Sequence, residues 1–362
     1  MDKSMQNTIY WLAISRLPGI GGVNVRKIGK SFSSPELLFQ ADDQKLKALG
    51  VPQKAHDAIR LGVDREEIGR ELDRWKEQGI GVLSFDDALY PEALRQIYDP
   101  PAVLYYLGDP GMLAYRRMAI VGARRCSSYG ERAAFTLARD LASLGICIVS
   151  GMAFGIDARA HQGALSADGR TVAVLGCGVD LCYPPENARL YRRIAEKGLL
   201  ISENPPGTEP KAGLFPKRNR LISGISEGVI IVEAGEKSGS LITAEEALEQ
   251  GHDVYAVPGS VFSYVSRGSN RLIQNGEAML IMEASDIPKV GNITRGLKEQ
   301  EPDFESEEER MIWRAVEEEG KTTEVLLETG LNSQVLQQTL MRMELKGWIE
   351  QTAGHRWIRK GS

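Results

Sequence analysis

The stretch Ile146-Cys147-Ile148-Val149-Ser150-Gly151-Met152-Ala153-Phe154-Gly155-Ile156-Asp157 carries the pattern that decides the fold. It begins with four consecutive apolar residues, passes through a loop with two glycines, and continues with helical spacing to Ser166. A strand with no polar alternation is covered on both faces, which is typical of a parallel sheet between two layers of helices. The stretch therefore predicts one strand–loop–helix unit of such a sheet.

The same order of strand and helix recurs on both sides of this unit. Further apolar runs lie at Met118–Val121, Val172–Leu175, Leu199–Ser202, Val229–Val232 and Val254–Val257. Stretches with helical spacing lie between them, at Tyr129–Leu144, Asn187–Lys197 and Leu241–Gln250. The alternation predicts an α/β fold, with a doubly wound and mainly parallel sheet over residues 116–283.

The N-terminal part, residues 1–78, lacks a strand pattern. Its apolar spacing indicates short helices joined by turns, with Leu17-Pro18-Gly19-Ile20-Gly21 between two of them. This organisation is typical of a SAM-like or helix-hairpin-helix module. Backbone N–H groups of such a hairpin can meet a DNA phosphate, but a purely structural hairpin has the same sequence, so both interpretations stay open.

The C-terminal part reads as a polar linker over residues 284–305 and a small domain over 306–362. Three helices are expected at Glu307–Glu319, Thr323–Glu328 and Ser333–Lys346, followed by a β-hairpin across Ala353-Gly354. That order predicts a winged helix. Because its acidic residues outnumber its basic ones, a protein-contact or regulatory role is favoured over duplex DNA binding.

Charge and composition limit the function classes. The 362 residues carry a formal net charge of −5, and no region concentrates positive charge, so a polyanion must bind at a local cluster. We find no apolar run of 18 residues, and the four cysteines form no C-x-x-C pair. We expect a cytoplasmic protein without a membrane segment.

Two loops that follow predicted strands carry anion-binding features. The first contains Gly122, Arg124 and Arg125, placed where a phosphate approaches a helix N-terminus. The second contains Ser150, Gly151 and Gly155, with glycines that free the backbone N–H groups. In a parallel sheet both loops lie at the carboxyl edge, where ligands bind. Arg at the second glycine position of the dinucleotide fingerprint argues against NAD.

Two further segments are expected at the same edge. Lys217, Arg218, Asn219 and Arg220 place three cations within four residues at the start of a helix. The segment from Lys237 to Thr243 opens another helix with small and hydroxyl residues. Its Ser238, Gly239, Ser240 and Thr243 are suited to hold a phosphate through capping and the helix dipole. A charge run is more often a solvated face, but its position before an apolar strand favours function.

Catalytic groups do not converge on these loops. Asp157 and His161 share a helix face, but no third ligand lies at metal-binding spacing, so a first-turn carboxylate and a packed imidazole are favoured. We expect no catalytic residue, no metal and no cofactor. The edge of the sheet is predicted to hold phosphates and not to break bonds.

A long series of segments, taken in order, resembles the DprA family of DNA-processing proteins, also called Smf. The series comprises Val121-Gly122-Ala123-Arg124, Ser128-Tyr129-Gly130, Ser150 to Asp157 with Ala160-His161, Tyr183-Pro184-Pro185-Glu186-Asn187, Ser202-Glu203, Phe215-Pro216-Lys217-Arg218-Asn219-Arg220, Glu233-Ala234, Ser238 to Ala244 and Val257-Pro258-Gly259-Ser260. The resemblance is dense over about residues 80–282.

The resemblance implies a Rossmann-like domain over residues 79–283 and a homodimer without enzymatic activity. It further implies a protein that binds single-stranded DNA without sequence specificity, protects incoming strands and loads the RecA recombinase during natural transformation. By position, Arg124 matches the family's strand-binding loop arginine. Lys217, Arg218 and Arg220 match its F-P-x-R-N-R motif, and Gly239 and Ser240 match its phosphate loop.

One departure from the family and two alternatives remain. The family pattern Leu-Ile-x-x-Gly-Ala ends here in Gly276-Glu277, which leaves the self-association surface unassigned. The first alternative is a nucleotide-binding phosphoribohydrolase-like enzyme that uses Glu233 and Glu245. The second is a winged-helix transcription factor that reads duplex DNA.

Overall fold

The computed structural model describes residues 3–288, 290, 304–316, 321–323, 327–352 and 356–359. The chain divides into two compact units, Met1–Ile287 and Pro288–Ser362. The first unit holds the N-terminal helices together with the large sheet. No helix among the described residues is long and apolar enough to cross a membrane.

The large sheet has nine strands in the order β1-β2-β6-β5-β4-β3-β7-β8-β9. Their bounds are Ile80–Ser84, Val103–Gly108, Arg117–Val121, Cys147–Ser150, Thr171–Val174, Leu199–Ser202, Gly228–Ile231, Asp253–Ala256 and Met279–Leu280, numbered β1 to β9 along the chain. Strands β3 to β9 pair in parallel, while β1 and β2 add an antiparallel edge. The predicted doubly wound parallel sheet is therefore confirmed.

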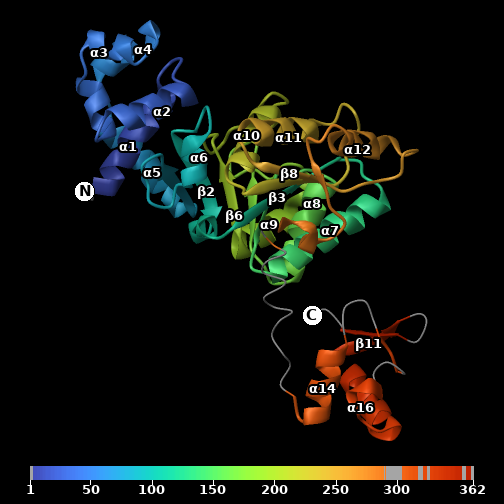
Figure 1. Cartoon of the computed structure of the whole chain (residues 1–362). Helices are drawn as coiled ribbons and strands as arrows, with labels where there is room; N and C mark the ends of the chain where they lie inside the picture. Colours follow the sequence, from blue (N-terminus) through green and yellow to red (C-terminus); the bar gives the residue numbers. More distant parts are fainter. Residues whose placement is uncertain are drawn as a thin grey trace. The chain divides into compact units, whose positions relative to one another are not determined.

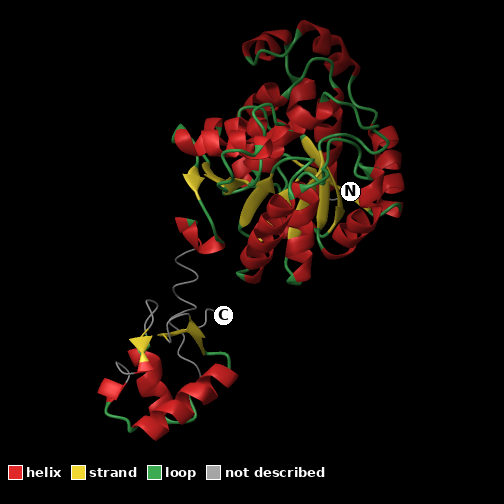
Figure 2. Cartoon of the chain, turned by 90° about the vertical axis from the view of Figure 1, so that its right-hand side faces the viewer, coloured by secondary structure: helices red, strands yellow, loops and turns green. Residues whose placement is uncertain are grey.

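Helices cover both faces of this sheet (Figures 1 and 2). One layer consists of α7 (Ser128–Ser143), α8 (Ile156–Ser166) and α9 (Ala188–Lys197). The other includes α10 (Leu214–Gly224), α11 (Gly239–Glu249) and α12 (Arg267–Gln274). The central strands β3 to β7 are buried at nearly every position, because both faces are covered.

The antiparallel edge strands β1 and β2 were not expected from the sequence. Gly81 lies within β1 opposite Tyr106 of β2, and a Cβ atom built on it would lie 2.1 Å from Cζ of Tyr106. Glycine leaves room for the end of the tyrosine side chain at this position, but it weakens the sequence signal of a strand. This edge extends the sheet toward the N-terminal helices.

The N-terminal region is helical, as the sequence predicts. It comprises α1 (Lys3–Arg16), α2 (Gly22–Ser31), η1 (Pro35–Gln40), α3 (Asp43–Ala48), α4 (Gln53–Leu61) and α5 (Arg65–Glu77). Between the edge strands lies α6 (Glu92–Gln96), and short 3-10 helices occur at η2 (Pro110–Ala114), η3 (Pro185–Asn187), η4 (Tyr264–Ser266) and η5 (Ala284–Asp286). Helices α1 and α5 contact β1, so this region is continuous with the sheet.

The second unit contains helices and a β-hairpin in the region where the sequence predicts a winged helix. Of the expected helices Glu307–Glu319 and Thr323–Glu328, residues 317–319 and 324–326 lie outside the described residues. The unit contains α14 (Glu307–Ala315), β10 (Lys321–Thr322), η6 (Leu327–Thr329), α16 (Ser333–Leu345), β11 (Ile349–Thr352) and β12 (Arg356–Arg359). Its strands pair in the order β10-β12-β11 around a core that includes Trp313, Leu340 and Trp357. The expected linker segment 291–303 and the hairpin turn 353–355 lie outside the described residues, and η5 places the start of the expected linker in the first unit.

Candidate nucleic-acid interface

A pocket of about 590 Å³ opens at the carboxyl ends of β3, β4 and β7. From β3 the chain winds first toward β4 and later, on the other side, toward β7, so this is the point where the strand order reverses. Such a switch point leaves a crevice for ligands between the loops of neighbouring strands. Nine of the fourteen residues predicted for the site line the pocket: Gly122, Arg124, Arg125, Arg218, Asn219, Ser238, Gly239, Ser240 and Thr243.

The loop after β3 is held in place by Glu233, which lies just after the end of β7. The Glu233 backbone carbonyl accepts a hydrogen bond from the Ala123 N–H at 2.7 Å, and its carboxylate accepts two from Ser127, at 2.8 Å and 2.6 Å. A Cβ atom on Gly122 would lie 2.8 Å from the same Glu233 carbonyl oxygen. Glycine at 122 and the buried glutamate together hold Arg124 and Arg125 at the rim.

The loop after β4 is fixed by Asp157 in the first turn of α8. The Asp157 carboxylate accepts hydrogen bonds from the N–H groups of Gly151 at 3.1 Å and Ala153 at 3.4 Å. Gly155 has a φ of 70°, and a Cβ atom there would lie 2.4 Å from the Ala123 carbonyl oxygen. Gly151 and Gly155 therefore shape the loop, while the Ser150 hydroxyl is buried and donates to the Ile120 carbonyl oxygen at 2.6 Å.

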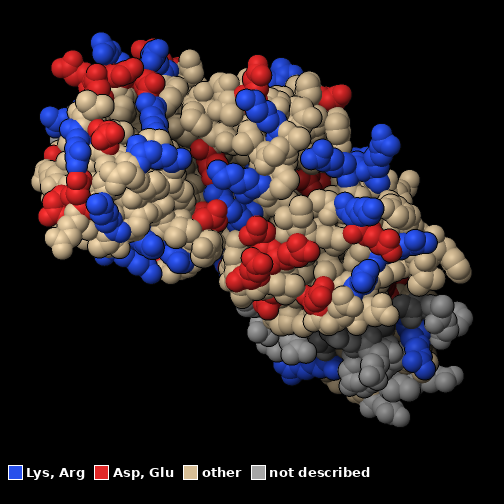
Figure 3. Space-filling model, turned by 90° about the horizontal axis from the view of Figure 1, so that it is seen from above, with Lys and Arg blue, Asp and Glu red and all other residues tan. Residues whose placement is uncertain are grey.

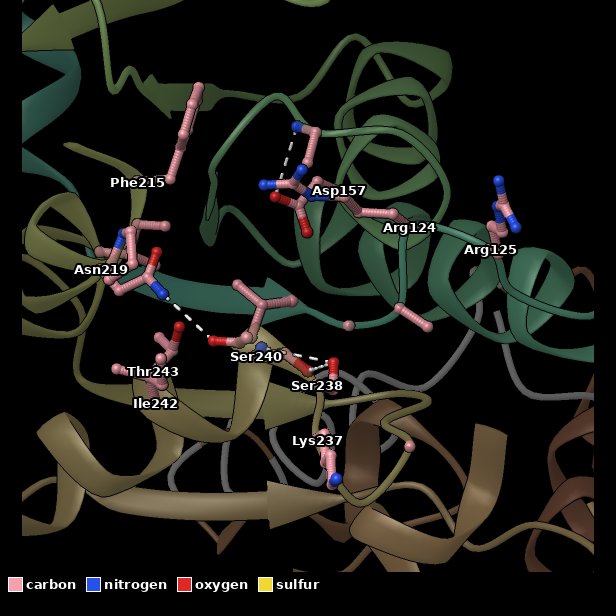
Figure 4. Close-up of a pocket in the computed structure, with 18 of the residues that line it drawn as sticks. Arg124, Arg125, Asp157, Phe215, Asn219, Lys237, Ser238, Ser240, Ile242 and Thr243 are labelled. Carbon is pink, nitrogen blue, oxygen red and sulfur yellow. Dashed lines mark hydrogen bonds between the residues drawn. The ribbon is translucent and has the colours of Figure 1, made fainter. Parts of the chain in front are cut away.

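Helix α10 joins the two sides of the pocket through buried polar side chains. Arg218 donates to the carbonyl oxygens of Gly151, at 2.8 Å, and of Val174. Asn219 donates to the Gly239 carbonyl oxygen at 3.2 Å (Figure 4). Burial lowers the pKa of the Arg218 guanidinium to about 10, and Asp157 opposes that shift. Burial also raises the pKa of Asp157, against the attraction of Arg218 and the backbone donors.

The structure divides the cationic run 217–220, which the sequence predicts to act as one anion-binding cluster. The Arg220 side chain is 6% exposed and is held by Asp99 at 2.9 Å and Glu203 at 2.7 Å. Lys217 is exposed but lies 3.5 Å from the same Glu203 oxygen. Of the run, only Arg218 and Asn219 line the pocket. Arg220 is therefore a buried structural cation. Its carboxylate partners, Asp99 and Glu203, come from two other segments of the chain.

The loop after β7 brings donor groups to the N-terminus of α11. Ser238 is the N-cap residue, and its hydroxyl accepts from the Ser240 N–H at 3.4 Å and lies 2.8 Å from the Ser240 hydroxyl. Gly239 is exposed, and a Cβ atom built there would meet no heavy atom within 4 Å. The positive end of the helix dipole favours an anion here.

Three exposed cations line the same pocket as this helix terminus: Arg124, Arg125 and Lys237. Arg124 reaches from its loop toward Phe215, with the guanidinium carbon 5.5 Å from the ring centre, whereas Arg125 points away from that ring (Figure 4). Lys237 lies on the β7 loop, below Ser238 in the view. Lys237 is the first residue of the segment that the sequence analysis names, but it is not among the predicted phosphate-binding residues.

Aromatic side chains line the neighbouring part of the site. A smaller hollow beside the main pocket is lined by Arg124 together with Phe154, Tyr183 and Phe215. Phe154 and Tyr183 are partly exposed, and the rings of Tyr183 and Phe215 lie 5.3 Å apart. Tyr264 lines the main pocket from η4 and was missed, since no motif in the sequence links it to the phosphate loops.

Acid–base and metal chemistry find little support in the described part of the chain. His161 is fully buried, with Nδ1 2.7 Å from the Thr171 hydroxyl, and burial lowers its pKa to about 3. The Asp157 carboxylate accepts hydrogen bonds from the backbone of the β4 loop. Among the described residues, no group of three His, Cys, Asp or Glu side chains is placed to hold a metal ion.

Charge over the wider surface is mixed. Figure 3 shows Lys and Arg interspersed with Asp and Glu on the face that it presents, in line with the net charge of −5. A polyanion is therefore attracted by the local cations at the pocket and not by a broad positive field.

Comparisons with known proteins agree on one family. The family model described as DNA recombination-mediator protein A matches residues 81–291. The chain is 46% identical to the DNA processing protein DprA of Bacillus subtilis over 258 residues, which cover 71% of this chain and 84% of that protein. It is 37% identical to protein Smf of Escherichia coli over 284 residues, covering 78% and 75%.

Two solved structures are similar in fold and sequence. The X-ray structure of DprA from Streptococcus pneumoniae has a TM-score of 0.67 and 34% identity, and covers 79% of this chain and 97% of that one. A structure described for the single-stranded DNA binding mode of DprA from Helicobacter pylori has a TM-score of 0.54 and 34% identity, and covers 60% and 96%. The chain belongs to the DNA recombination-mediator protein A family, whose curated members are called DprA or Smf.

Proposed function

We propose that this chain binds single-stranded DNA without sequence specificity at the pocket between the β3, β4 and β7 loops. One observation carries the proposal: Arg124, Arg125 and Lys237, all exposed, line one pocket with the N-terminus of α11 at the switch point of the sheet. Cations and backbone donors of this kind neutralise phosphates, which every nucleotide presents alike. Binding then depends on the backbone of the strand and not on its sequence.

The aromatic side chains beside the pocket add a reason to favour a single strand. Bases of a flexible strand can turn out and stack on rings such as Phe154 and Tyr183, which a duplex does not allow without unpairing. A rigid duplex also fits poorly into a hollow formed by three loops at a sheet edge. The Helicobacter pylori relative is described as a protein that binds single-stranded DNA, which supports single-strand binding by this chain.

Beyond strand binding, family membership supports a role in DNA recombination. We infer that the protein acts in the cytoplasm as a homodimer, protects incoming single strands and loads the RecA recombinase onto them during natural transformation. In this account the protein binds DNA and performs no chemistry on it. Any contribution of the N-terminal hairpin or of the winged helix to DNA contact is secondary to the pocket.

A nucleotide-cleaving enzyme of the phosphoribohydrolase type is the alternative. Such an enzyme needs a carboxylate that is free to act on the sugar. The Glu233 carboxylate is buried and accepts two hydrogen bonds from Ser127, while Glu245 is exposed on α11 and does not line the pocket. This arrangement favours strand binding over hydrolysis.

A nuclease-protection assay tests the proposal against this alternative. Single strands of unrelated sequence are incubated with the protein and then with a single-strand nuclease, and nucleoside monophosphates are incubated in parallel. Binding predicts protection of every strand and no release of free base. Strands that stay fully digestible while monophosphates are hydrolysed would establish the enzyme instead.

A further inference from the structure

A contact between the N-terminal helices and the sheet domain begins at the first residue of α2. A Cβ atom built on Gly22 would lie 2.2 Å from the backbone carbonyl carbon of Asp99 and 2.5 Å from its Cα atom. One turn later, Arg26 donates to the Ile97 carbonyl oxygen at 3.4 Å and lies over the Tyr98 ring at 5.8 Å. Helix α2 thus fixes the segment 97–99 at two successive points.

The Asp99 side chain continues this contact into the sheet domain. Its carboxylate accepts from Nε of Arg220 at 2.9 Å, and Nη2 of Arg220 reaches Glu203 at 2.7 Å. The side chains of Arg220 and Glu203 are only 6% and 10% exposed, so solvent screens this ion pair weakly. Arg220 is therefore held between a carboxylate that α2 positions and one at the end of β6.

Arg220 belongs to the same turn of α10 as the residues that hold the pocket loops. Arg218 bonds the Gly151 carbonyl oxygen of the β4 loop, and Asn219 bonds the Gly239 carbonyl oxygen of the phosphate loop. A displacement of this turn changes both hydrogen bonds at once. We infer that Asp99 is a positioning residue, which transmits the position of α2 to the strand-binding pocket through Arg220.

This inference rests on the proposed function for its binding readout, and its experiment uses two substitutions at the contact. Asp99→Ala removes the carboxylate that holds Arg220, and Gly22→Ala forces α2 away from Asp99. The matched control for the first is Glu249→Ala, which removes a carboxylate from the same surface hollow. The matched control for the second is Gly21→Ala, since a Cβ atom at Gly21 meets nothing within 4 Å.

Single-strand affinity and its salt dependence are measured by fluorescence anisotropy for the full-length chain and all four variants. We expect roughly 3- to 30-fold weaker binding for the two contact variants, the range found for couplings between sites. Their salt slope should equal that of the wild type, because no phosphate contact is removed. Unchanged affinity would overturn the inference, and so would a slope reduced by about 0.7, which marks a lost phosphate contact.

Hydrogen exchange in the DNA-free protein separates this inference from the proposed function. Either contact variant should speed amide exchange in segments 150–157 and 236–243, while the controls should not. If the wild type fails to bind single strands, the proposed function fails, and the exchange data still decide whether Asp99 positions the loops. Unchanged exchange in both segments would contradict the positioning role even if DNA binding is confirmed.

Discussion

The guanidinium of Arg218 on α10 donates a hydrogen bond of 2.8 Å to the backbone carbonyl oxygen of Gly151, 67 residues earlier in the chain. The contact is so close that a Cβ atom on Gly151 would lie 2.5 Å from the guanidinium nitrogens. The sequence suggests Arg218 as a phosphate contact, but its guanidinium donates to backbone carbonyl oxygens and interacts electrostatically with Asp157. Arg218 forms part of the pocket wall, whereas Arg124 and Arg125 are exposed at the pocket.

Arg124→Glu should weaken single-strand binding by at least about tenfold, because a charge-assisted phosphate contact is replaced by repulsion. The side chain is exposed, so the free energy of unfolding should stay close to that of the wild type. Anisotropy and urea denaturation check the two expectations. Arg139→Glu, an exposed charge reversal on α7, is the control. Unchanged affinity of Arg124→Glu would remove the β3 loop from the site.

Unlike Arg124→Glu, which should change affinity, Arg218→Met should mainly lower the free energy of unfolding. It removes the buried cation whose attraction lowers the pKa of Asp157, and it leaves the carbonyl oxygens of Gly151 and Val174 without this donor. Leaving a buried hydrogen-bonding group without its partner costs about 1–3 kcal/mol, which urea denaturation can measure.

The neighbouring substitution Lys217→Met is the control for Arg218→Met. Lys217 is exposed, and its change in unfolding free energy should stay within about 0.5 kcal/mol. If the two variants are equally stable, Arg218 is not the structural cation that the structure indicates.

The buried His161 predicts a pH dependence of stability. Its pKa is about 3 in the folded protein and near 6.5 when exposed, so the unfolded chain binds the extra proton between these values. Stability should therefore fall as pH is lowered from 6.5 toward 3. Asp157, whose pKa is raised, contributes with the opposite sign, because its folded form binds the proton more readily.

The difference between the wild type and His161→Gln isolates the histidine contribution. The variant should lose less stability than the wild type when urea midpoints are compared across this pH range. Parallel pH profiles for the two proteins would show that His161 does not remain neutral in the fold.

Deleting residues 303–362 should leave single-strand affinity within about twofold of the full chain, because residues 1–287 form a compact unit that contains the whole pocket. Anisotropy with the same oligonucleotides measures the effect. A large loss would assign a share of DNA binding to the C-terminal unit.

The sequence predicts the central sheet well, since the buried parallel strands are continuous apolar runs. Strand β1 escapes prediction because Gly81 makes room for Tyr106, a contact visible only after the strands pair. The glycine and hydroxyl loops of the site were also predictable, because local chemistry at a strand end defines them.

The roles within the cationic run were not predictable from its spacing. Buried Arg220 forms ion pairs with Asp99 and Glu203, and buried Arg218 interacts electrostatically with Asp157. All three acidic residues lie in other segments of the chain. The role of Glu233 in holding the β3 loop was not predictable for the same reason. Sequence patterns predict local structure and local chemistry. The roles of these residues depend on contacts between segments that only folding brings together.

The most direct test of strand binding at the pocket is anisotropy with labelled single-stranded and duplex oligonucleotides of unrelated sequence across a salt series. The account predicts tight binding of every single strand, weaker binding of duplexes, and a log–log salt slope of about 0.7 for each phosphate neutralised. Equal, weak binding of both forms, or a preference for the duplex, would contradict it.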